Sequence, residues 1–106
     1  MTLISTYIES PNQIDLIHRF NIDQLIVDLP FCSIRAHAPF DWSNDELLQL
    51  SAMSSSLMLN LDGIYSDDEL KIIKDTIHQR SLAEIFDGFR IQDIGLIEWV
   101  KTNFPN

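Results

Sequence analysis

Two kinds of hydrophobic pattern alternate along the chain, and the alternation occurs four times. Short apolar runs near residues 6–8, 25–27, 57–59 and 86–91 have the composition of buried strands. Each run is followed by a stretch in which apolar residues recur every three or four positions, and this spacing predicts an amphipathic helix with a buried apolar stripe. The stripes include Phe20 in the first helix, Ile73 and Ile77 in the third, and Val100 in the last. Strands that alternate with helices in this way predict a parallel sheet with helical crossovers.

The predicted helices have recognisable starting signals. Ser43 and Ser66 are each followed three residues later by a glutamate, which is the spacing of a capping box. Ser10 stands before a proline, and Asp93 stands before the last amphipathic stretch. These four caps lie 33, 23 and 27 residues apart (10 to 43, 43 to 66 and 66 to 93), the separation expected of successive βα units.

We therefore predict an α/β fold of four consecutive βα units, half of a TIM-type (β/α)8 barrel, in a single domain over residues 1–106. A small doubly wound sheet is the alternative, although no glycine-rich phosphate loop follows the first strand. Half a barrel has two open edges, and its inner face, expected to carry Ile26, Met58 and Phe89, lacks a partner layer. We expect a homo-oligomer, a separate subunit or the remainder of a longer chain to complete it.

The charge balance narrows the classes of partner. Sixteen acidic residues face seven basic ones, for a formal net charge of −9, which disfavours nucleic acid and anionic membranes as partners. Cys32 is the only cysteine, and no apolar run approaches the roughly 20 residues of a membrane-spanning helix. We expect a cytoplasmic protein, and the sequence predicts neither a cofactor nor a metal site.

Polar residues stand where the predicted strands end, and parallel folds place their functional groups there. These residues are Glu9, Asp28, Asn60, Asp62, Gln92 and Asp93. Carboxylates and amides at one edge suit a cation, a polar substrate or acid–base chemistry. Local roles also account for two of them, since Asp93 fits a helix cap and Asp62 fits a turn before a glycine.

The segment "FCSIRAHAPFDW" lies between a predicted strand and a predicted helix. Its Arg35 is placed to hold an anion bidentately or to pair with an acidic residue at the surface. Cys32 and His37 are near enough in sequence for a nucleophile and its base, although a buried cysteine explains Cys32 equally well. His18 and His78 fall in helical patterns and are predicted to be surface residues. No established catalytic motif is present.

Three stretches together resemble the N-terminal part of the peptidase U32 family, the collagenase-like proteases. They are "FCSIRAHAPFDWSNDEL", "LMLNLDGIYSDDEL" and "FDGFRIQDIGLIEWVKTNFP", and they cover most of residues 24 to 105. The chain departs from the family pattern at "FNIDQ" and "SAMSSS", and the family's signature and its cluster-binding cysteines lie farther downstream. The resemblance implies the front half of a barrel. By position in the motifs it also implies site roles for Arg35, Asn60 and Asp93.

Three functional hypotheses follow. The first is a U32-like peptidase-family segment without catalysis as an isolated chain, with Arg35, Asn60, Asp93 and Glu9 as candidate substrate-binding residues. The second is an assembly module that forms a homodimer through its open sheet edges. The third is a small metal-dependent enzyme that uses Glu9, Asn60, Asp62 and Asp93.

Overall fold

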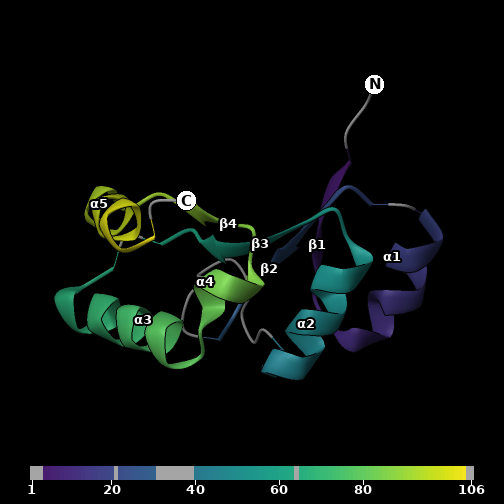
Figure 1. The fold of residues 1–106 in the computed structure, drawn as a ribbon, viewed down its shortest axis with the longest axis horizontal. Helices are drawn as coiled ribbons and strands as arrows, with labels where there is room; N and C mark the ends of the chain where they lie inside the picture. Colours follow the sequence, from purple (N-terminus) through teal and green to yellow (C-terminus); the bar gives the residue numbers. More distant parts are fainter. Residues whose placement is uncertain (1–3, 21, 31–39, 64, 105–106) are drawn as a thin grey trace.

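A four-stranded parallel sheet forms the centre of the molecule. The computed structural model describes residues 4–20, 22–30, 40–63 and 65–104. The strands are β1 (Ser5–Ile8), β2 (Gln24–Val27), β3 (Ser56–Leu61) and β4 (Gly88–Ile91), in the spatial order β1-β2-β3-β4 (Figure 1). The predicted parallel sheet is confirmed. The order does not reverse within this sheet, so it differs from the doubly wound alternative.

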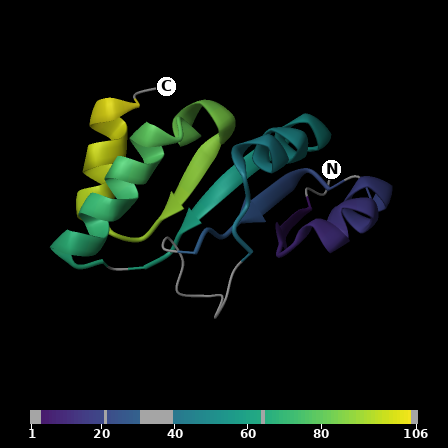
Figure 2. The ribbon, with the colours of Figure 1, turned by 90° about the horizontal axis from the view of Figure 1, so that it is seen from below.

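Most of the helices lie on one face of the sheet (Figures 1 and 2). The helices are η1 (Pro11–Gln13), a short 3₁₀ helix, α1 (Ile14–Phe20), α2 (Asn44–Met53), α3 (Asp67–Gln79), α4 (Leu82–Ile85) and α5 (Ile94–Asn103). Figures 1 and 2 show α1 to α4 on the same face, while α5 lies at the β4 end of the sheet. The short helix α4 was not predicted from the sequence. Within the described residues, none of the helices has the length and apolar character needed to cross a membrane.

The register separates the two faces of the sheet. Ile8, Val27, Leu59 and Phe89 are neighbours in one row, and all four belong to or pack against the hydrophobic core that the helices cover. Met58 is one residue out of step with that row, so it points to the opposite face. The prediction that Phe89 shares a face with Met58 is therefore wrong, because Phe89 pairs with Leu59.

The capping boxes at Ser43 and Ser66 are confirmed, with both reciprocal hydrogen bonds present in each. The pKa of Glu69 is lowered because its carboxylate accepts a hydrogen bond from the backbone N–H of Ser66, at 2.8 Å, and interacts with the Ser66 hydroxyl. Asp93 caps α5 by accepting a hydrogen bond from the backbone N–H of a residue three positions on. Ser10 makes no side-chain cap, and the first helical segment begins as a 3₁₀ turn.

The apolar stripes of the helices are confirmed only in part. Ile73 and Ile77 of α3 are buried as predicted, and they pack into the core beneath the sheet. Phe20, expected in the stripe of the first helix, is 62% exposed. In α5 the buried residue is Leu96, while the predicted stripe residue Val100 is only half-buried.

Candidate functional site at the carboxyl ends of the strands

The face of the sheet away from the helices carries polar side chains near the carboxyl ends of the strands. Asn60 of β3 pairs in register with Arg90 of β4. Asp28 follows directly after β2 and lies beside Asn60, to which it is hydrogen-bonded. Parallel strands bring their carboxyl ends to one edge, which is where α/β folds place their sites.

Asp28 and Asn60 form a buried polar pair. The side-chain amide of Asn60 donates a hydrogen bond of 2.8 Å to the Asp28 carboxylate. Asn60 is 1% exposed and Asp28 is 5% exposed. Burying a carboxylate is unfavourable unless it is hydrogen-bonded, so this contact stabilises the arrangement of the two strand ends. The amide and the carboxylate are thereby held in fixed orientation.

The side chains of Arg90 in β4 and Tyr7 in β1 meet over the same face of the sheet. Nη1 of Arg90 donates a hydrogen bond of 2.6 Å to the hydroxyl of Tyr7. Its guanidinium carbon also lies 5.9 Å from the centre of the Tyr7 ring, a cation–π distance. The two contacts place a positive charge on the face of the sheet away from the helices.

A small solvent-facing cavity of about 220 Å³ lies beside these residues. It is lined by Asn60, Asp62, Arg90, Ile91 and Gln92. The cavity combines a guanidinium, a carboxylate and two amides. Such a set can bind a polar ligand that carries both signs of charge.

Three of the four predicted site residues fall within the described residues, and each has different surroundings. Asn60 lies in the cavity. Asp93 sits at the start of α5, where its carboxylate accepts hydrogen bonds from the backbone N–H groups of Leu96 and Tyr65, so its local role is a cap. Glu9 is exposed after β1, and its backbone N–H donates to a glutamine side chain of the 3₁₀ turn. Arg35 lies outside the described residues, as do Cys32 and His37.

Two residues of this face were missed by the sequence reasoning. Tyr7 was read only as a strand former, and Arg90 was not considered. Arg90 did carry a signal, since a charged residue between the apolar Phe89 and Ile91 is unusual in a strand covered on both faces. The sequence carried no signal for the contact between Arg90 and Tyr7, because the two residues are 83 positions apart.

His18, His78 and Trp42 do not line the cavity at the strand ends. His18 and His78 are exposed, as predicted, and the His78 ring packs edge-on against Trp99 at 5.3 Å. Trp42 is buried in the core, and its carbonyl accepts a hydrogen bond from Arg80. In the described part of the chain, no three histidine, cysteine, aspartate or glutamate residues come together as metal ligands, so the metal-enzyme hypothesis gains no support there.

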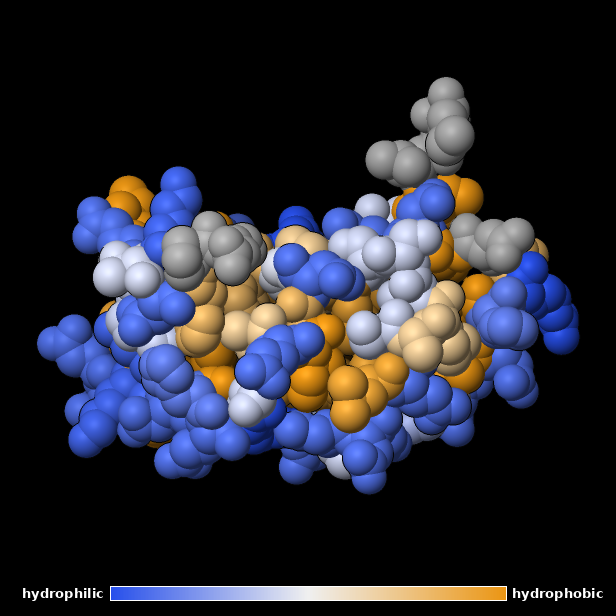
Figure 3. Space-filling view, in the orientation of Figure 1, coloured by the Kyte–Doolittle hydropathy of each residue, from blue (hydrophilic) through white to orange (hydrophobic). Residues whose placement is uncertain are grey.

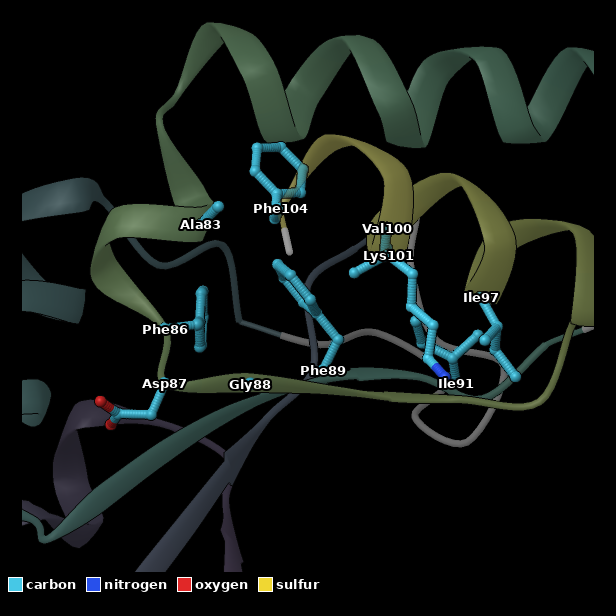
Figure 4. Close-up of a pocket in the computed structure, with 10 residues that line it drawn as sticks. All are labelled: Ala83, Phe86, Asp87, Gly88, Phe89, Ile91, Ile97, Val100, Lys101 and Phe104. Carbon is cyan, nitrogen blue, oxygen red and sulfur yellow. The ribbon is translucent and has the colours of Figure 1, made fainter. Parts of the chain in front are cut away.

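A second, apolar groove lies at the β4 end of the sheet. It has a volume of about 330 Å³, and β4, α4 and α5 form its walls. Its apolar lining includes Phe86, Phe89, Ile91, Ile97, Val100 and Phe104. Figure 4 shows the three phenylalanine rings gathered between α4, α5 and β4, with Asp87 pointing away. In Figure 3, apolar residues lie across the middle of the visible face, whereas hydrophilic residues cover the outer side of α3.

Comparisons with protein-family models, with curated proteins and with solved structures find no match to this chain.

Proposed function

We propose that this chain is a barrel segment of the peptidase U32 type and that it works as an assembly module. Two copies pair through their β1 and β4 edges to complete an eight-stranded barrel. The topology of the sheet carries this proposal: four parallel strands follow one another in order, with α1 to α4 on a single face.

A barrel accounts for both faces of such a sheet. In a (β/α)8 barrel the helices cover the outside, and the strands enclose the inner face among themselves. Here Ile26 and Met58 are neighbours on the face away from the helices, where a closed barrel has its interior. Among the described residues, β1 pairs only with β2 and β4 only with β3. Outer strands with unpaired backbone groups are sites of association.

The groove beside β4 supports a strand as the partner. The groove opens on the helix side of β4. If another strand paired with the outer edge of β4, its side chains on that side would fill the groove. The β1 end of a second copy offers a matching apolar side chain, because Ile4 is 47% exposed and falls on the same side as Ile8. Pairing β4 of each copy with β1 of the other repeats one contact twice about a two-fold axis, so the assembly closes.

A proline in β1 tests the assembly. The carbonyl of Ile4 accepts hydrogen bonds from Asp23 and Gln24 beside it, so its peptide groups face β2 and the N–H of Ser5 faces outward. Ser5→Pro therefore removes an outward donor at the first residue of β1, a position where strands tolerate proline. Ser5→Ala is the matched control, because it loses the same side-chain contact to Gln24 but keeps the N–H.

Analytical ultracentrifugation at micromolar concentration measures the result. We expect dimers for the natural chain and for Ser5→Ala, and monomers for Ser5→Pro. A stable, well-folded monomer of the natural chain contradicts the proposal, and so does a Ser5→Pro variant that dimerises as tightly as the control.

The U32 resemblance leads to a second expectation, that the isolated chain does not hydrolyse peptides. Among the described residues, those that line the cavity at the strand ends include no serine, threonine, cysteine or histidine that could act as a nucleophile. Incubation with a fluorogenic casein substrate tests this expectation. Hydrolysis that disappears on substitution of Arg90 or Asn60, while the fold is preserved, would show that the segment is catalytic.

A further inference from the structure

The cavity at the ends of β3 and β4 has the chemistry of a zwitterion site. Arg90 offers a planar guanidinium, and Asp62 lines the same cavity with a carboxylate. The side chains of Asn60 and Gln92 complete the polar lining. We propose that this cavity binds a free α-amino acid, with the ligand carboxylate on Arg90 and its ammonium group on Asp62.

Arg90 retains donors for such a ligand. A guanidinium has five N–H donors, and the hydrogen bond to Tyr7 uses one of them. Within the described part of the chain, the hydrogen bond and the ring contact of Arg90 both go to Tyr7, so its charge is oriented without being neutralised. A guanidinium held in this orientation can donate two parallel hydrogen bonds to a carboxylate.

The charges favour a zwitterion over a simple anion. The chain has a formal net charge of −9, and the Asp62 carboxylate lies in the cavity itself, so both repel a phosphate or a dicarboxylate. A ligand that carries an ammonium beside its carboxylate has no net charge and meets a partner for each group. Asp62 already interacts within the chain, but a carboxylate has about four lone-pair sites and accepts further donors.

The size of the cavity selects a small amino acid. Its volume of about 220 Å³ corresponds to roughly seven water molecules at about 30 Å³ each. Alanine, serine and valine have a comparable number of non-hydrogen atoms. A ligand of this size, held by a few polar contacts at a solvent-facing site, binds with an affinity on the order of millimolar.

This inference does not rest on the proposed assembly, because all the lining residues come from neighbouring strands of one chain. Titration of ¹⁵N-labelled protein with L-alanine, followed by NMR, tests it. We expect saturable shifts for the amides of residues 60–62 and 90–92. Acetate and methylammonium, which each carry half of the zwitterion, are expected to bind at least about tenfold more weakly, since each leaves one charge unpaired.

Variants assign the contact to Arg90. Arg90→Gln is expected to weaken alanine binding at least about tenfold, and Arg90→Lys, which keeps the charge but loses the fork, by an intermediate factor. Lys71→Gln is the control, because it removes one exposed positive charge from α3. Asp62→Asn tests the ammonium contact if Arg90→Gln does not fold. No saturable shift with alanine, equal binding of acetate, or alanine affinity of Arg90→Gln within twofold of the control each overturns the proposal.

Discussion

The buried pair of Asp28 and Asn60 gives the sharpest test of what stabilises the sheet face away from the helices. In Asn60→Ala the Asp28 carboxylate loses a donor at 2.8 Å. A hydrogen bond to a charged group contributes about 1.5–3 kcal/mol to stability. Asp28 has further interactions of its own, so it is not left wholly unpaired. We therefore expect a loss of about 2 kcal/mol, the middle of that range.

Asn60→Asp is the more severe change at the same position. It replaces the donor with a second carboxylate at hydrogen-bond distance from the first. Two like charges about 4 Å apart repel by about 4 kcal/mol at an effective dielectric constant of about 20. Because domains of this size are typically stable by only 5–15 kcal/mol, we expect Asn60→Asp to be close to unfolding at neutral pH.

Urea unfolding at one fixed protein concentration measures both losses, with far-UV circular dichroism as the signal. Asn103→Ala is the matched control. It removes an exposed asparagine that also donates one hydrogen bond, to the carbonyl of Trp99, and should cost less than about 0.5 kcal/mol. The reasoning fails if Asn60→Ala is as mild as this control, or if Asn60→Asp is no worse than Asn60→Ala.

Three further predictions concern the helix ends. The lowered pKa of Glu69 stabilises the fold above pH 4.5, and this contribution is lost as the pH falls through the lowered value; Glu69→Gln should therefore show a weaker acid dependence in unfolding series at several pH values. Arg80→Met removes hydrogen bonds to Asn44 and to the Trp42 carbonyl, so the free energy of unfolding in urea should fall by about 2 kcal/mol. Ser81 has φ 54°, so Ser81→Val should lower that free energy by about 1–2 kcal/mol, whereas Ser81→Gly should not lower it.

The strands and caps were predictable because their signals are local. The run from Leu25 to Val27 is apolar at every position, and the structure confirms a buried strand there. The serine–glutamate spacing at Ser43 and Ser66 describes hydrogen bonds within one helical turn, so no distant contact can alter it. Ser10 shows the limit of this reasoning, because a serine before a proline fits a cap by composition but forms none here.

Elements that depend on tertiary contacts were missed. α4 has only four residues. The residue before it, Ser81, has a left-handed backbone conformation that serine seldom adopts. An isolated helix of that length is not stable, so packing of Leu82 and Ile85 into the core must hold it. Its apolar residues gave the sequence analysis no distinguishable period. As a result, Phe86 was assigned to the strand, although it caps the end of α4.

The sequence did not predict the register between β3 and β4, which determines the neighbours of Arg90 at the candidate site. Alternation alone places Arg90 on the opposite face from Phe89, but it does not say which residue of β3 stands beside it. The pairing of Asn60 with Arg90 fixes that relation and brings the guanidinium to the face that carries Asp28. Only then does the reach of Arg90 to Tyr7 follow, since their side chains must span two intervening strands. A charged residue in a strand that is otherwise suited to burial therefore marks a candidate site residue before the register is known. The register then identifies the residues that it contacts.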